Sequence, residues 1–373
     1  MKVYEKEAKS ILIKRKRIDS WFLSSYNMNL YRGCSHNCAY CDGRAENYFI
    51  KGEFGSDIEV KINAPEILEK ELNPNNKRKP FEQGFILIGG GVCDTYEPIE
   101  LKFELTRKAL EIIKKYNRPV HILTKSNNIE RDIDLLVEIN KKSKVIVSFS
   151  FSTVDKEITQ IFEPSAPSPA QRLNTIKKLK EKGISTGIFL MPVIPFITDK
   201  PNKILEVYEA AKSIGADYLI FGGMTLKSGR QQNHFYNKLA EYDEKLLLEY
   251  SSIYRDDKWG NPVPEYYEYI NHIFLMISKK FRIPKRIPNY IYKDQLDKNK
   301  YISVLLDQLD YLVKLNYGKS NYGLASKSIF ELERPITELR NRLKTINGVC
   351  TESEKVIKEI MNSGTSQYYE KLL

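Results

Sequence analysis

Cysteine and histidine are scarce in this chain of 373 residues, which contains five cysteines and four histidines. An odd number of cysteines and a highly charged start, MKVYEKEAKS, argue against a secreted protein held together by disulfides. The sequence also lacks the segments HExxH, GxSxG and GxxxxGKS/T. Their absence argues against the zinc proteases, serine hydrolases and P-loop proteins that carry those motifs.

Long hydrophobic runs are absent as well. No run approaches the roughly 18 apolar residues that a membrane-spanning helix needs, and the segment GIFLMPVIPFI is short and contains two prolines. We therefore expect a soluble, cytoplasmic protein with no membrane partner. In that compartment closely spaced cysteines bind metal more often than they form disulfides.

Positive charge exceeds negative charge, with 59 Lys and Arg against 48 Asp and Glu, a formal net charge of +11. This excess favours a polyanionic partner, although only weakly because it is spread over a long chain. One basic cluster, at residues 14–17, shortly precedes Trp21, Phe22 and Tyr26. Two interpretations stay open, namely phosphate contact with base stacking, or a charged arm beside a buried aromatic anchor.

Short apolar runs alternate with amphipathic stretches between about residues 84 and 222. The runs lie at 85–90, 119–125, 145–152, 185–193 and 218–223, and a further strand is expected at 27–32. Apolar strands separated by crossover helices predict a parallel sheet covered on both faces or closed into a barrel. Six βα units are too few for a closed TIM barrel, so we predict an α/β fold with a partial (β/α)6 barrel of the TIM type.

The helical pattern continues where the strands stop. After about residue 235 apolar residues recur at helical spacing, as in ISVLLDQLDYLVKLNY at 302–317. We expect a basic extension over residues 1–24, the partial barrel over 25–235 and a mostly helical region over 236–373.

Unusual residues follow the predicted strands. A cysteine-rich loop follows the first strand and GGGVCDTYEP, residues 89–98, follows the second, while Lys125 ends the third strand and Ser150 and Ser152 end the fourth. Because ligands of such folds bind at the carboxyl ends of the strands, we expect these residues to converge on one site.

Three of the five cysteines stand close together, in the spacing Cys34-x3-Cys38-x2-Cys41. A structural zinc site normally has four ligands, and His36 lies between two of these cysteines, where a short loop would struggle to place it as the fourth. A [4Fe–4S] cluster held by three thiolates keeps one iron free of protein ligands. Such an iron is a place where a chelating substrate or cofactor binds.

This loop resembles the cluster loop of the radical S-adenosylmethionine (SAM) superfamily, including the aromatic Tyr40 before the third cysteine. The order of NLYRGCSHNCAYC, CDTYEPIE, ILTKS, FEPSAPSPAQRL and MPVIP resembles the branch that includes spore photoproduct lyase, often labelled DNA repair photolyase-like. The resemblance covers about residues 25–225 and not the helical remainder.

The resemblance implies a [4Fe–4S] cluster and SAM as cofactors, and a reductase or a ferredoxin- or flavodoxin-type protein as electron donor. The implied reaction is reductive cleavage of SAM to methionine and a 5′-deoxyadenosyl radical, which takes hydrogen from the substrate in a lyase or other radical transformation. The substrate is unassigned, and nucleic acid is the leading class.

The resemblance also implies site residues. The cluster ligands are Cys34, Cys38 and Cys41, and the cofactor-binding residues are Tyr40, Gly89, Gly90, Gly91, Asp94, Lys125, Ser150, Ser152, Glu163, Arg172 and Met191. The glycines would cradle the methionine amino group, Lys125 and Ser150 the carboxylate, and Tyr40 and Met191 the adenine. Glu163 and Arg172 would brace the ribose side or each other.

Two further residues are expected to act in catalysis. Spore photoproduct lyase has a cysteine on the loop after the second strand that returns hydrogen to the product radical, and tyrosines that pass the radical on. Cys93 lies on the corresponding loop, two positions after the expected place at Gly91, and Tyr96 is close enough in sequence to be the relay. The alternative for Cys93 is a small buried apolar side chain.

A different class of protein is the main rival interpretation. A non-catalytic nucleic-acid-binding protein would hold a structural metal at the three cysteines. It predicts zinc or a fully ligated cluster, and no turnover of SAM.

Overall fold

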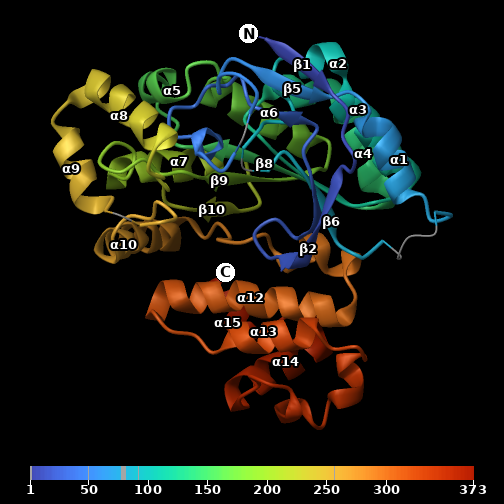
Figure 1. Cartoon of the computed structure of the whole chain (residues 1–373). Coiled ribbons are helices and arrows are strands. Elements are labelled where there is room, and N and C mark those ends of the chain that lie inside the picture. The colour runs from blue at the N-terminus through green and yellow to red at the C-terminus, as the bar shows by residue number, and fades with distance from the viewer. Residues whose placement is uncertain (1, 49, 77–80, 91, 256) are drawn as a thin grey trace.

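Seven strands form the main sheet of the computed structural model, which describes residues 2–48, 50–76, 81–90, 92–255 and 257–373. Their order across the sheet is β10 (Leu219–Phe221), β9 (Ser185–Leu190), β8 (Val145–Phe151), β7 (Val120–Thr124), β6 (Phe85–Ile88), β3 (Ser24–Met28) and β2 (Leu12–Asp19). In this sheet β3, β6, β7, β8, β9 and β10 are parallel to one another, and β2 pairs antiparallel with β3. The predicted partial barrel of six parallel strands is confirmed (Figure 1).

Crossover helices cover the outer face of this sheet. They are α1 (Ala64–Leu72), α2 (Glu100–Phe103), α3 (Leu105–Lys115), α4 (Ile133–Lys142), α5 (Lys156–Phe162), α6 (Pro169–Glu181) and α7 (Pro201–Ser213), with a 3-10 helix at Asn127–Asp132. Local sequence explains their form: α3 buries Leu105, Ala109 and Ile113 at helical spacing, and Ser168 begins α6 with a capping box.

A second, smaller sheet pairs β5 (Ile58–Lys61) with β1 (Val3–Lys6) and β4 (Tyr31–Arg32). The first strand, expected at 27–32, is therefore misplaced. The barrel strand β3 lies earlier, and residues 31–32 belong to the second sheet. The segment expected as an extension over 1–24 contains β1 and β2, and β2 forms one edge of the barrel sheet.

The barrel is open because β2 and β10 are the two edges of the main sheet, with no pairing between them in the described residues. The helices α8 (Arg230–Asp243), α9 (Leu246–Ile253) and α10 (Pro264–Phe281) follow β10. They run along one side of the barrel in Figure 1.

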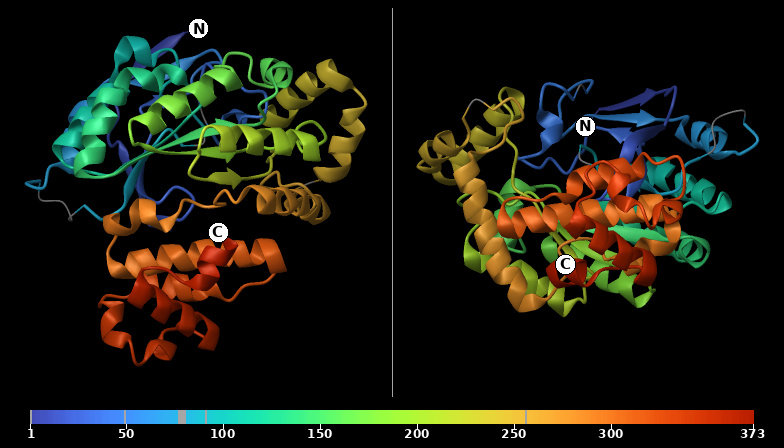
Figure 2. Two further views of the ribbon diagram at one scale, coloured as in Figure 1. Left: turned by 180° about the vertical axis from the view of Figure 1, so that it is seen from behind. Right: turned by 90° about the horizontal axis from the view of Figure 1, so that it is seen from below.

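The remaining chain is helical, as expected. It forms α11 (Asn289–Tyr292), α12 (Lys298–Tyr317), α13 (Tyr322–Phe330), α14 (Thr351–Ser363) and α15 (Gln367–Leu372), with 3-10 helices at Asp42–Arg44 beside the cysteines and at Lys293–Gln295, Ile336–Leu339 and Leu343–Thr345. The helices α12 to α15 lie together on one side of the sheet (Figures 1 and 2).

Two hydrophobic cores result. The first lies between the sheet and its outer helices, and the second joins inward-facing strand residues to the C-terminal helices. In this second core Phe85, Ile146 and Tyr218 belong to the same cluster as Leu305 and Leu309 of α12. The C-terminal helices therefore fill one end of the concave face, and the end near the strand carboxyl termini stays hollow. Among the described residues no helix is both long and apolar enough to cross a membrane.

Candidate active site

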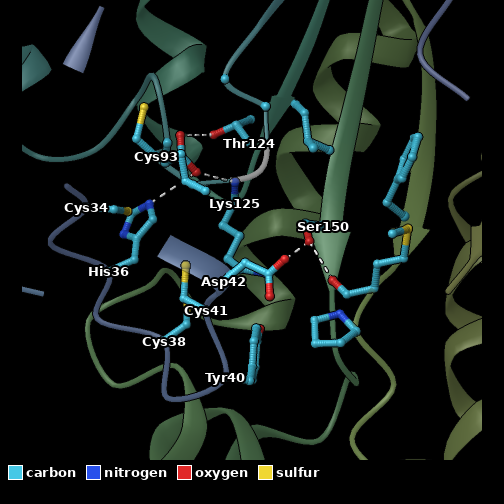
Figure 3. Close-up of a pocket in the computed structure, with 18 of the residues that line it drawn as sticks. Cys34, His36, Cys38, Tyr40, Cys41, Asp42, Cys93, Thr124, Lys125 and Ser150 are labelled. Atoms are coloured by element: carbon cyan, nitrogen blue, oxygen red, sulfur yellow. Dashed lines mark hydrogen bonds and ion pairs between the residues drawn. The ribbon is translucent and has the colours of Figure 1, made fainter. Parts of the chain in front are cut away.

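A cavity of about 380 Å³ lies at the carboxyl ends of the strands. It brings together the cysteine loop and the ends of β6 to β9, through Cys34, Cys38, Tyr40, Cys41, Gly89, Gly90, Cys93, Asp94, Lys125, Ser150 and Met191. Figure 3 shows the three cysteines on one side of the cavity and Ser150 on the other. The predicted convergence of strand-end residues occurs, and the roles assigned to them stay predictions. Gly91 lies outside the described residues.

Short-range hydrogen bonds shape the cysteine loop. The amide of Cys41 donates to the carbonyl of Cys38 at 3.3 Å, and the amide of Ala39 donates to the carbonyl of Phe162 at 2.8 Å. The Arg44 guanidinium donates back to the Cys38 carbonyl at 3.1 Å. These bonds turn the loop so that Cys34 and Cys38 are buried and Cys41 is partly buried, all as free thiols.

The three thiols suit an iron–sulfur cluster. Burial raises the pKa of Cys38 to about 12 and holds the pKa of Cys34 well above its ordinary value, so a bound cation is what would favour thiolates here. In the described part of the chain no three His, Cys, Asp or Glu side chains converge as a single metal ion requires. A cluster needs no such convergence, because its thiolates bind different irons. His36 faces Asp94 instead, with Nε2 3.3 Å from Oδ2.

A buried charged network stands beside the cysteines, centred on Glu163. Its carboxylate accepts hydrogen bonds from the Tyr40 hydroxyl, the Arg172 guanidinium and, at 2.8 Å, the Ser152 hydroxyl. Burial raises the pKa of Glu163, but the positive charges of Arg172 and Lys125 and the Tyr40 hydrogen bond outweigh it and lower that pKa well below its ordinary value. The carboxylate is therefore charged although it is buried.

The network fixes the one cation that we expect to touch the cofactor. The Lys125 ammonium lies 3.0 Å from the Ser150 hydroxyl and 3.5 Å from Glu163, and Ser150 donates to the Met191 carbonyl at 2.9 Å. Lys125, Ser150 and Met191 line the cavity.

Three of the expected cofactor ligands are not on the cavity wall. Ser152, Glu163 and Arg172 are buried behind it and bond to one another or to the backbone, so their contacts brace Tyr40 and Lys125. We expected Glu163 and Arg172 to brace either the ribose side of SAM or each other, and in the structure they form an ion pair with each other.

Asp94 lines the cavity, but its hydrogen bonds go to the protein. The carboxylate accepts from the Lys125 amide and the Thr124 hydroxyl, both at 2.7 Å, and from the Tyr96 amide at 2.9 Å. Asp94 thus ties the loop after β6 to the end of β7. These bonds suit a bracing role better than the cofactor contact that we expected.

Gly89 and Gly90 line the cavity, and their predicted contact with the methionine amino group stays a prediction. Gly89 has a φ of +75°, and a Cβ atom there would stand 2.6 Å from the Leu123 carbonyl oxygen. Only glycine fits this turn at the end of β6.

The two residues expected to act in catalysis differ in position. Cys93 lines the cavity, and its thiol donates to the Tyr31 carbonyl at 3.3 Å. Its role as a hydrogen donor stays a prediction. Tyr96 corrects our expectation: its side chain is fully buried away from the cavity lining, and its hydroxyl donates to Asp132 at 3.1 Å. We expected Tyr96 near the site because it is close to Cys93 in the sequence. In the structure the Cys93 side chain lines the cavity and the Tyr96 side chain points to Asp132 instead.

Several residues of the site were missed by sequence reasoning. Gln231, fully buried in the first turn of α8, donates to the Tyr40 carbonyl and to Asp42, both at 3.0 Å. This bond fixes the Tyr40 carbonyl in place, and the carbonyl oxygen keeps a second lone pair for a further hydrogen bond. The cavity also includes Arg15, Phe22 and Asn27 from β2, β3 and their turn. The basic cluster at 14–17 was the signal for Arg15, whereas nothing in the sequence marked Gln231.

Comparisons with known proteins agree with this site. The model of the Radical SAM superfamily matches residues 28–207. An uncharacterized protein of Methanocaldococcus jannaschii is 31% identical over 213 residues, which are 57% of this chain and 75% of that protein. An uncharacterized protein of Mycobacterium tuberculosis is 27% identical over 262 residues, which are 69% of this chain and 75% of that protein.

Solved structures share the fold. Spore photoproduct lyase complexed with dinucleoside spore photoproduct superposes with a TM-score of 0.56 at 17% identity, covering 75% of this chain and 79% of that chain. A variant of the same lyase with bound AdoMet and dinucleoside spore photoproduct gives the same TM-score at 18% identity, with 75% and 79% covered. The chain therefore belongs to the radical SAM superfamily and is a radical SAM enzyme, which implies SAM and an iron–sulfur cluster as cofactors and a need for a reductant.

Proposed function

We propose that this enzyme holds a [4Fe–4S] cluster on Cys34, Cys38 and Cys41, cleaves SAM reductively and acts on a nucleic acid. The observation that carries the proposal is the placement of three free thiols across one cavity from a lysine and a serine at strand ends. When bound, the cluster supplies the electron that converts SAM to methionine and a 5′-deoxyadenosyl radical, which removes hydrogen from the substrate.

The residues of this chain bind and orient the reactants. The Lys125 ammonium and the Ser150 hydroxyl lie 3.0 Å apart on the cavity wall. Both would hydrogen-bond the carboxylate of SAM, and the bond from Lys125 would be charge-assisted. Gly89 and Gly90 let an amino group approach the backbone, and Met191 offers an apolar surface to the adenine. Cys93, on the same wall, is our candidate for the hydrogen donor. The cavity holds these groups close together.

The choice of nucleic acid has two supports. The formal charge of +11 favours a polyanion. Spore photoproduct lyase, which has the same fold, is solved with a dinucleoside spore photoproduct. We further propose a ferredoxin- or flavodoxin-type electron donor and a reducing, cytoplasmic setting, since all five cysteines are free.

Anaerobic reconstitution tests the cofactor assignment. The protein should bind about four irons and four sulfides per chain and, with dithionite and SAM, release 5′-deoxyadenosine. Cys38→Ser and Cys41→Ser should lose both. Cys350→Ser is the matched control, because Cys350 is a free cysteine at the start of α14, and it should keep both.

Two results would overturn the assignment. One is zinc as the bound metal with no release of deoxyadenosine. The other is equal loss of iron in the Cys350 control and in the loop variants, which would show that the loop is not the specific site.

A further inference from the structure

Part of the cavity wall has no role in the cofactor chemistry described above. Arg15, Phe22 and Asn27 line the cavity together. They come from β2, the turn after it and β3, a hairpin that almost entirely precedes residues 28–207, where the superfamily match lies. Arg15 and Phe22 therefore lie outside the part of the chain that the superfamily model matches.

Arg15 is positioned rather than free. Its Nε donates to the Asn27 side-chain oxygen at 3.0 Å, and its Nη1 lies 3.1 Å from the Asp19 carboxylate. Its side chain is 32% exposed. In the described part of the chain Nη2 makes no hydrogen bond or ion pair, so its two N–H groups are available to a ligand. A guanidinium held on one side and open on the other is suited to bind a phosphate.

An aromatic ring lines the same cavity. Phe22 is partly exposed and stacks on the buried Phe189, with ring centroids 5.0 Å apart and planes 3° apart. A cation and an aromatic ring in one cavity fit a ligand that has a planar base and a charged backbone.

The topology places Arg15 where a long substrate would leave the cavity. The strand β2 is one edge of the open sheet, and residues 223–225, which also line the cavity, follow β10 at the other edge. Lys16 and Arg17 continue along β2, exposed and with no ion pair among the described residues. Repeated cations along one strand favour repeated anions over a single carboxylate.

We propose that Arg15 binds a backbone phosphate of a nucleic-acid strand whose target nucleotide enters the cavity against Phe22. This rests on the proposed function, because the nucleotide must reach the cofactor in the same cavity. Of the four residues in the basic cluster, Arg15 is the one on the cavity wall. Lys14 pairs with Glu82 instead.

The test measures binding of a fluorescein-labelled single-stranded 12-mer DNA to the reconstituted enzyme by anisotropy. Arg15→Gln should raise Kd about tenfold or more, as expected for a lost charge-assisted bond. Arg15→Lys should restore part of the loss. Arg334→Gln removes the same charge from an exposed site in the C-terminal helical region, away from β2 and the cavity wall, and should change Kd less than threefold.

Salt dependence separates phosphate contact from a structural role. The slope of log Kd against log salt should fall by about 0.7 in Arg15→Gln, the value for one phosphate contact on a single strand. Thermal melting should show that both glutamine variants are folded.

Each way of failing has its own signature. No deoxyadenosine from the wild type would overturn the proposed function. Deoxyadenosine release with equal Kd values for Arg15→Gln and the wild type would overturn the role of Arg15 alone. Displacement of the oligonucleotide by a glutamate peptide of equal charge and concentration would overturn the assignment to a phosphate backbone.

Discussion

At the scale of single residues, Glu163 is a buried carboxylate that stays ionised. A lone buried carboxylate would take up a proton, but here the pKa is lowered by Arg172, Lys125 and the Tyr40 hydroxyl. Removing the negative charge would leave the fully buried Arg172 without a counter-charge.

Glu163→Gln should therefore lower the free energy of unfolding of the apoprotein by about 3 to 5 kcal/mol, the usual cost of breaking a buried ion pair. The measurement is urea unfolding. Glu157→Gln is the control, because Glu157 is exposed in the first turn of α5. Equal unfolding midpoints for the two variants would contradict the claim that the pair is essential to the fold.

The sequence predicted the residues that line the cavity more accurately than the buried residues that support them. The residues at strand ends, such as Lys125 and Ser150, line the cavity because their strands are parallel and end at one edge. The direction of a side chain within a turn is not written in the sequence, so Tyr96 was assigned to the wrong surroundings. Contacts between distant segments, such as Gln231 with Tyr40, leave no local pattern.

At the scale of elements, a chain of hydrogen bonds links β7, β8 and the residue before β10. His121 of β7 donates through Nδ1 to the Phe22 carbonyl at 2.8 Å, and its Nε2 lies 2.6 Å from the hydroxyl of Ser148 on β8. Ser148 bonds in turn to the Tyr218 hydroxyl, just before β10, at 2.7 Å. Burial lowers the pKa of His121 from 6.5 to about 4, so this chain of hydrogen bonds is built on neutral imidazole.

This shift predicts acid sensitivity. The unfolded chain binds a proton at His121 below about pH 6.5 and the folded chain only near pH 4, so stability should fall as pH decreases through that window, by up to about 3 kcal/mol. Urea unfolding at pH 7.5, 6.5, 5.5 and 4.5 measures the slope. His121→Gln should make this decrease in stability smaller; His234, whose pKa is lowered to about 4, acts in the same direction, and Glu97, whose pKa burial raises to about 7, acts in the opposite direction. An unchanged slope would show that His121 is not responsible.

The periodicity of the sequence predicted the buried strands and the helices but not the edge strands. The strands β6 to β10 are mostly apolar and almost entirely buried, because helices cover both faces of the sheet. The segments VYEK and LIKRKRID, which form β1 and β2, are rich in charge because edge strands keep one side in water. In β3, SSYNM, polar residues hid the first barrel strand.

At the scale of the whole molecule, the C-terminal helices and the barrel share one core. Arg286, fully buried, is held between the rings of Trp21, 4.1 Å from its centroid, and Tyr311 of α12, 3.4 Å from its centroid. With the shared cluster beneath it, this contact predicts that the barrel and the helical region unfold together.

Leu309→Ala tests that prediction, because Leu309 is fully buried in α12. Hydrogen exchange measured by mass spectrometry reports separately on the amides of β6 to β8 and on those of α12. The variant should lower the free energy of opening by about 2 to 5 kcal/mol in both sets of amides. Leu324→Ala, at an exposed site on α13, should change it little. A loss confined to the amides of α12 would indicate two independent domains.

The order of segments along the chain has a practical consequence. Strand β2 and its turn come before the part of the chain that the superfamily model matches, yet they form part of the rim of the reaction chamber. Arg15 and Phe22 can therefore be substituted without altering the cysteine loop or the strand ends that carry the other cavity residues.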